Sequence, residues 1–269
     1  QGTVFRSKGA PILDLARPED MSVEVQRRLL DSIQDANTQH LTQRQGNSDL
    51  ASRIASYELA YKMQSTAPEA VDLATEDAAT LEMYGINNDR TRDFGTRCLM
   101  ARRLVQRGVR FIQLYSGGSH NDANWDAHGD LEVNHNKHAG NTDLPIAALL
   151  ADLKQRGMLE DTLVIFGGEF GRTIYCQGTL TRDNYGRDHH PRCFTTWMAG
   201  AGIKGGTVYG ETDDFSYNIV KDPVHIRDLN ATILQQMGID HNKFSVDFRG
   251  LNQRLTGVEE ARVIKGILA

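Results

Sequence analysis

The sequence has 269 residues, of which 39% are hydrophobic and 24% are charged, and its formal net charge is −5. A chain of this length can bury a sizeable core, and its acidic balance with dispersed Lys and Arg argues against nucleic acid as the main partner. It holds no run of about eighteen apolar residues, so we predict no transmembrane segment, and three cysteines without a CxxC pair leave the redox compartment open.

The N-terminal part of the sequence is predicted to be mostly helical. Residues 1–18 read as an extended entry segment without an initiator methionine or signal peptide. The start resembles the interior of a longer protein, and we interpret the chain as a fragment or a processed form. Four segments then have apolar residues at helical spacing, and we expect residues 1–107 to pack as helices on a sheet formed by the rest of the chain. These segments are residues 18–44, 47–64, 75–84 and 94–106.

Beyond Gly108, apolar runs typical of strands alternate with amphipathic segments typical of helices. This alternation is typical of a parallel sheet covered by helices. We therefore expect residues 108–269 to be an α/β portion with a mainly parallel sheet flanked by helices, and the whole chain to be one incomplete domain. The expected strands are residues 109–118, 162–170 and 193–203, and the expected helices are residues 142–158 and 222–239.

Residue types that bind metal ions gather in three loops of this second part. Eight of the nine histidines follow residue 119. Ligands in open α/β sheets bind beyond the carboxyl ends of the strands, where these loops are expected. Asp, Glu and His suit a divalent ion such as Zn, Mn, Mg or Ca, and the absence of nearby Cys argues against a structural zinc site. The residues are His120, Asp122, Asp126 and His128 in the first loop, Glu169 in the second, and Asp188, His189 and His190 in the third.

We predict that Asp126, His128, Glu169, Asp188 and His189 form a divalent metal site. Asp126 and His128 stand two residues apart and can turn toward one ion, while Asp188 is either a ligand or the partner that orients a histidine. Each residue also has a structural interpretation. Asp126 and His128 can form a solvated turn, Glu169 can cap a helix, and His189 can be a core histidine bonded to a carbonyl. The convergence of three loops favours the metal site.

Two arginines beside these loops are predicted to hold an anion during catalysis. The guanidinium groups of Arg172 and Arg187 match a pair of sulfate or phosphate oxygens. The other histidines receive no ligand role. We interpret His135 and His138 as solvated or as partners behind the ligands, His225 as structural, and His40 as lying on a polar helix face.

Several motifs in fixed order resemble the bacterial family called domain of unknown function 1501. They are "WDAHGD", "EDTLVIFGGEFGRT", "GRDHHP", "MAGAGIKGGTVYGETDDF" and "VHIRDLNATILQQMGID". The resemblance is dense from Ile54 to Ala269. It implies the fold of the alkaline-phosphatase-like superfamily, and members of the family are often described as sulfatases. It also implies twin-arginine export, and therefore a periplasmic or otherwise exported protein.

Metal ligands can be carried over from this resemblance only in part. Asp126 and His128 match the family's "WDxH", and His189 is similar to the late histidine ligand of the superfamily. Glu169 stands where the superfamily often has Asp followed by His, but here Phe170 follows. One expected nitrogen ligand is therefore absent.

The segment that supplies the nucleophile in the superfamily is not present in these residues. It is a first strand with a loop that carries another Asp and a Ser, Thr or Cys, and the order of the motifs does not cast Ser116 or Ser119 in that role. The resemblance thus implies a metal-dependent hydrolase of a small-molecule or glycan sulfate or phosphate ester, completed by a missing N-terminal segment. The alternative is an exported non-catalytic binding or structural module that retains the fold.

Overall fold

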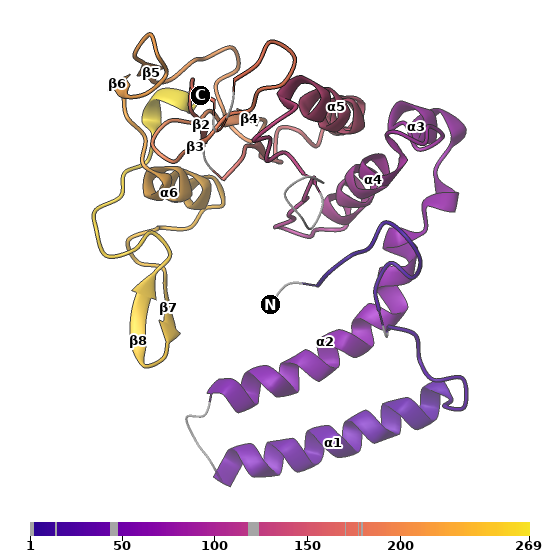
Figure 1. Ribbon diagram of the computed structural model, residues 1–269. Coiled ribbons are helices and arrows are strands. Elements are labelled where there is room, and N and C mark those ends of the chain that lie inside the picture. Colours follow the sequence, from indigo (N-terminus) through magenta and orange to yellow (C-terminus); the bar gives the residue numbers. More distant parts are fainter. Residues whose placement is uncertain are drawn as a thin grey trace. The chain divides into compact units, whose positions relative to one another are not determined.

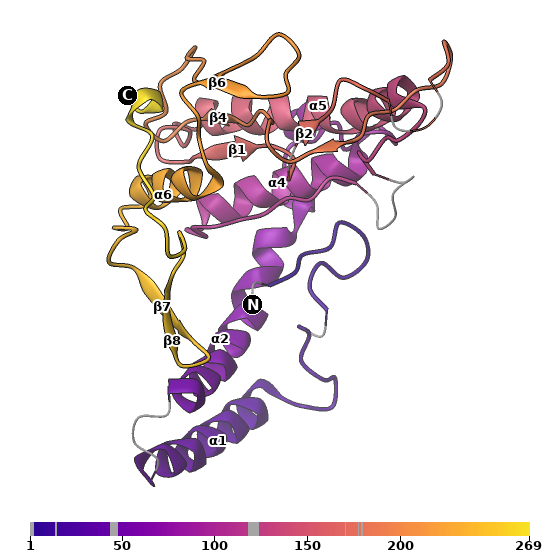
Figure 2. The ribbon, with the colours of Figure 1, turned by 60° about the vertical axis from the view of Figure 1, so that its left-hand side comes forward.

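The structure is a computed structural model that describes residues 3–13, 15–43, 48–117, 124–169, 171–176, 178 and 180–269. The chain divides into two compact units, Gln1–Leu114 and Tyr115–Ala269. Figures 1 and 2 show the first unit as helices and the second as a mixture of helices, short strands and long connections.

The first unit is built from the helices that the apolar periodicity predicts. Helices α1 and α2 contact each other, and α2 also contacts α4 (Figure 1). Tyr84, Cys98 and Leu99 are fully buried. Gly95 permits this packing, because a Cβ atom there would lie 2.2 Å from the carbonyl oxygen of Tyr84. The elements are α1 (Val23–Gln43), α2 (Ser48–Val71), η1 (Leu73–Thr75), α3 (Ala78–Met83) and α4 (Arg92–Gln106).

A buried ionic network joins α4 to the end of α2. Arg102 Nη2 lies 2.5 Å from Glu76 Oε2, and Arg103 forms a second ion pair with the same carboxylate. Arg103 Nε also donates to the carbonyl of Ala70, 2.8 Å away, in the last turn of α2. The arginine therefore satisfies a helix-end carbonyl that has no partner within its own helix.

Within its described residues, the second unit contains one long α-helix, one shorter α-helix and four separate pairs of strands. The N-terminus of α6 is closed by a capping box, in which the side chains of His225 and Asp228 accept hydrogen bonds from the helix backbone. The pairs are β1–β4, β2–β3, β5–β6 and β7–β8, and all four are antiparallel. The elements are α5 (Leu131–Gln155), β1 (Val164–Phe166), β2 (Gly171–Arg172), β3 (His189–His190), β4 (Trp197–Ala199), β5 (Glu211–Thr212), β6 (Ile219–Lys221), α6 (Ile226–Gln236), β7 (Ser245–Phe248), β8 (Leu251–Arg254) and η3 (Lys265–Ile267).

The prediction of a mainly parallel, alkaline-phosphatase-like sheet is wrong. The first expected strand forms no strand in its described part, residues 109–117. The other two expected strands contain β1 and β4, but these pair antiparallel, with Val164 opposite Ala199 and Phe166 opposite Trp197. A parallel pair needs a crossover connection, usually a helix. Between β1 and β4 the described chain instead forms the β2–β3 pair, so the second strand can return in the opposite direction.

Candidate metal centre

The two motifs "GEFGRT" and "GRDHHP" meet because β2 pairs with β3. Gly171 lies opposite His190, and Arg172 lies opposite His189. Only glycine fits at position 171, since a Cβ atom there would lie 1.8 Å from the carbonyl oxygen of Cys193. The pairing places the side chains of Arg172 and His189 on neighbouring strands.

A second close approach brings the "WDAHGD" loop to the same place. The backbone N–H of Arg187 donates to the carbonyl of Ala127 at 3.0 Å, and that of Leu131 donates to the carbonyl of Tyr185 at 3.0 Å. Between these bonds lies the buried Gly186, where a Cβ atom would be 2.1 Å from the carbonyl carbon of His128. The two loops therefore touch backbone to backbone, which a larger residue at position 186 would prevent.

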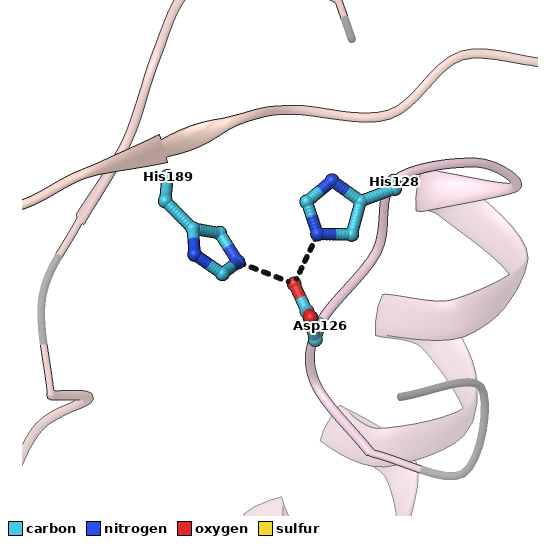
Figure 3. Close-up of side chains that lie close together, drawn as sticks. All are labelled: Asp126, His128 and His189. Carbon is cyan, nitrogen blue, oxygen red and sulfur yellow. Dashed lines mark hydrogen bonds and ion pairs between the residues drawn. The ribbon is translucent and has the colours of Figure 1, made fainter. Parts of the chain in front are cut away.

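These contacts gather three side chains around one carboxylate oxygen of Asp126. Asp126 Oδ1 lies 2.9 Å from His128 Nε2 and 2.8 Å from His189 Nε2. Figure 3 shows the carboxylate pointing between the two imidazole rings, whose centroids are 4.9 Å apart. Arg172 Nη1 lies 2.6 Å from the same oxygen. The potential ligand atoms of Asp126, His128 and His189 all lie within 4.8 Å of one another.

The groups around Asp126 keep its carboxylate ionised. Burial alone would raise its pKa. Hydrogen bonds from His189 and Arg172, together with the charges of Arg172 and His128, outweigh burial and lower the pKa of Asp126 to about 2. The carboxylate of Asp126 is therefore ionised at any pH near neutrality.

The donor set of Asp126, His128 and His189 fits a divalent metal ion. One carboxylate oxygen and two imidazole nitrogens are ligands that zinc and related ions accept, and three protein ligands leave positions open, as in catalytic zinc sites. The exposed fractions of the side chains, 18%, 35% and 39% respectively, give access to solvent. One detail departs from the usual pattern. His128 Nδ1 is buried and has no hydrogen-bond partner in the described structure, whereas a ligand histidine usually holds one there.

The other two predicted carboxylate ligands lie outside this cluster. Glu169 is exposed and is not part of the group of ligand atoms found among the described residues. Asp188 Oδ1 accepts the backbone N–H of His189 at 2.7 Å, and its carbonyl accepts the N–H of Thr173 at 2.9 Å. Asp188 thus fixes the β2–β3 connection and orients the backbone of His189. His120, Asp122, Ser119 and Phe170 lie outside the described residues.

The two predicted anion-binding arginines have different environments. Arg172 is bonded to Asp126, so its charge already has a partner. The guanidinium of Arg187 lies 5.3 Å from the centre of the Tyr185 ring and donates to the carbonyl of Gly186 at 3.1 Å. Because it forms no ion pair within the described part of the chain, Arg187 is the better placed of the two to receive an anion.

Sequence reasoning missed the residues that support the Asp126 loop. Asn124 Oδ1 accepts the backbone N–H of Asp126 at 2.7 Å, an Asx turn that the Asn-x-Asp spacing could have indicated.

His190, the residue after His189, has a structural role. It is 5% exposed, its Nε2 lies 2.8 Å from the carbonyl oxygen of Tyr217, and its ring stacks on that tyrosine.

Comparison with known proteins identifies a family without a described activity. The family model described as "Protein of unknown function (DUF1501)" matches residues 1–268. Searches of curated proteins and of solved structures found no match. Within the described helices, none combines the length and the apolar character needed to cross a bilayer. The match supports neither the alkaline-phosphatase-like superfamily nor the sulfatase description, but it covers nearly the whole chain, and the protein therefore belongs to the DUF1501 family.

Proposed function

We propose that this protein is a metal-dependent hydrolase of an anionic sulfate or phosphate ester, and that Asp126, His128 and His189 hold the metal ion. One observation carries the proposal, namely the approach of two imidazole nitrogens to one carboxylate oxygen. His189 is 63 residues from Asp126 in the sequence. The close backbone approach at Gly186, where a Cβ atom would lie 2.1 Å from the carbonyl carbon of His128, brings the two segments together.

Each side chain of the site has a distinct part in this proposal. Asp126 supplies negative charge, and the two imidazoles supply neutral nitrogen donors. A divalent ion held by Asp126, His128 and His189 would supply polarisation of an ester oxygen and would make water a stronger nucleophile. Arg187 binds a non-bridging oxygen of the ester through its guanidinium, and Arg172 keeps the carboxylate of Asp126 ionised and oriented.

A second function, a non-catalytic binding or structural module, is favoured by one specific contact. The guanidinium of Arg172 lies 2.6 Å from the Asp126 oxygen that would bind a metal. In this function the four side chains tie the β2–β3 pair to the "WDAHGD" loop, and the protein turns over no substrate.

Metal content and hydrolysis of model esters separate these functions. Purified protein would be analysed for bound metal and assayed with p-nitrophenyl phosphate and p-nitrophenyl sulfate. We expect about one divalent ion per chain, and we expect Asp126→Asn to lose both the ion and the hydrolysis. His40→Ala removes an exposed histidine of α1 and serves as the control for non-specific metal binding.

The outcomes of this experiment are distinct. Metal binding with hydrolysis, both lost in Asp126→Asn, supports the hydrolase. Metal binding without hydrolysis of either ester favours the non-catalytic module. Metal content that is the same in wild type, Asp126→Asn and His40→Ala contradicts the metal site itself.

A further inference from the structure

We infer that Asn134 and His138 of α5 are positioning residues, which aim the carboxylate of Asp126 at the metal site without touching the metal. The inference rests on the proposed function and extends it to side chains behind the site. The feature that carries it is a set of contacts between α5 and the two residues that precede Asp126.

The first of these residues, Asn124, is bonded on both sides. Its side-chain Oδ1 accepts the backbone N–H of Asp126 at 2.7 Å. Its carbonyl accepts Nδ2 of Asn134 at 2.9 Å, and the backbone of Asn124 also bonds to the ring of His138. Asn134 and His138 stand four residues apart and therefore lie on the same face of the helix. Asn124 thus connects α5 to the backbone of Asp126.

The second residue, Trp125, is fixed by its ring. Its Nε1 donates to Ser116 Oγ at 3.1 Å. The indole lies beside His138, with centroids 5.3 Å apart and planes tilted by 34°, and meets His135 edge to face at 5.7 Å. Both residues before Asp126 are therefore held against the same helix.

His138 is suited to a positioning role and unsuited to direct contact with substrate. It is only 5% exposed, and its Nε2 is buried without a hydrogen-bond partner in the described structure. The bond to Asn124 therefore uses Nδ1. Burial lowers the pKa of His138, and the charges of Lys137 and His135 lower it further. A neutral ring that donates from Nδ1 to the Asn124 carbonyl agrees with both observations.

The direction of the Asp126 carboxylate depends on this arrangement. Its Oδ1 meets three nitrogens at 2.6–2.9 Å, so the oxygen has little room to move without losing contacts. Metal ligands must be held within about half an ångström of their working geometry. Residues that orient a ligand from behind typically change metal affinity by about 10- to 100-fold when they are replaced.

The test uses two variants of α5 and a matched control in the full chain. Asn134→Asp keeps the shape of the side chain but removes the donor to Asn124, and His138→Gln keeps a donor of different reach. Asn136→Asp makes the same charge change at an exposed position of the same helix. The measurements are Zn²⁺ affinity by calorimetric titration and hydrogen exchange of the Asp126 amide by NMR.

We expect Asn134→Asp to weaken Zn²⁺ binding by about 10- to 100-fold and to speed exchange of the Asp126 amide. Exchange of the other α5 amides should stay as in wild type, His138→Gln should be intermediate, and Asn136→Asp should resemble wild type. If wild-type protein binds no Zn²⁺, the proposed function fails, while faster exchange of the Asp126 amide still supports positioning. Unchanged Asp126 exchange in Asn134→Asp, or equal Zn²⁺ affinity in Asn134→Asp and Asn136→Asp, overturns the inference.

Discussion

His189 Nε2 lies 2.8 Å from Asp126 Oδ1, although 63 residues separate the two along the chain. The contact joins strand β3 to the loop that carries Asp126, and neither segment builds it alone. It depends on the β2–β3 pair, which fixes His189, and on the close approach at Gly186, which fixes the loop of Asp126. This dependence leads to predictions in which the same kind of change has different effects at neighbouring positions.

The adjacent residues His189 and His190 should respond differently to replacement by alanine. His189 is 39% exposed and contacts Asp126, so His189→Ala should lose metal binding with little change in stability. His190→Ala leaves the carbonyl of Tyr217 without its partner and removes a ring stack, which should lower the free energy of unfolding by about 1–3 kcal/mol. Urea denaturation and metal titration of both variants check this. Equal stability losses would contradict the assignment.

Gly186→Ala should disrupt the metal site through the backbone. A Cβ atom at Gly186 would lie 2.1 Å from the carbonyl carbon of His128, so the two loops must separate. We expect metal affinity to fall by at least about tenfold, by analogy with the loss of an orienting contact. Gly205→Ala is the matched control, because a Cβ atom at Gly205 meets no atom within 4 Å. A metal affinity of Gly186→Ala equal to that of wild type would show that the close approach of Gly186 to His128 is not required for metal binding.

Glu76→Gln should destabilise the first unit strongly, and less so in acid. The change leaves two buried arginines, Arg102 and Arg103, without their carboxylate, which typically costs about 3–5 kcal/mol. Burial acts to raise the pKa of Glu76, but the bonds and charges of the two arginines lower it below its ordinary value of 4.5.

The direction of the pH effect follows from that shift. A carboxyl group with a lowered pKa stabilises the folded protein above pH 4.5, and this contribution is lost as the pH falls through the folded-state pKa. The difference in unfolding free energy between wild type and Glu76→Gln should therefore be full at neutral pH and shrink below pH 4.5. Denaturant titrations at several pH values measure it. A difference that grows in acid would refute this account.

Arg187→Met should weaken binding of the ester more than that of the metal. The guanidinium of Arg187 forms no ion pair in the described part of the chain, and methionine keeps a similar length without the charge. We expect KM for p-nitrophenyl phosphate to rise by about tenfold, the scale of one charged hydrogen bond. Arg182→Met removes an exposed arginine upstream of the same motif and should leave KM unchanged. A similar rise in both variants would argue for a general charge effect.

Local patterns predicted the helices well and the sheet poorly. The helical periodicity of residues 94–106 and of the segment that contains α6 matches helices in the structure, although α4 buries every residue from Cys98 to Leu104 rather than one face alone. α5 begins at Leu131, before the expected residue 142, because the polar residues of its first turns gave no apolar stripe. The apolar runs around β1 and β4 marked strands, but an apolar run carries no information about strand direction.

The candidate site was predictable as a set of residue types but not as a set of contacts. Asp126, His128 and His189 stand out as His and Asp in loops, and the structure brings all three together. Glu169 is also a ligand-type residue in a predicted loop, but it lies outside the cluster. Its position depends on where strand β2 begins, which the sequence pattern did not show. The ion pair between Arg172 and Asp126 depends on the pairing of β2 with β3, and no local sequence pattern specifies which strands pair.

The contact between Arg172 and Asp126 also affects how the site would fill. Arg172 serves as an internal counter-ion, since its guanidinium balances the carboxylate whether or not another cation is near. A metal ion entering the site must therefore exchange with an existing partner rather than add to a bare charge. Such an exchange weakens net affinity and favours ions that bind imidazole well over ions that bind only oxygen. If the proposed metal site is correct, the same arginine would also hold the two loops together whenever no ion is bound.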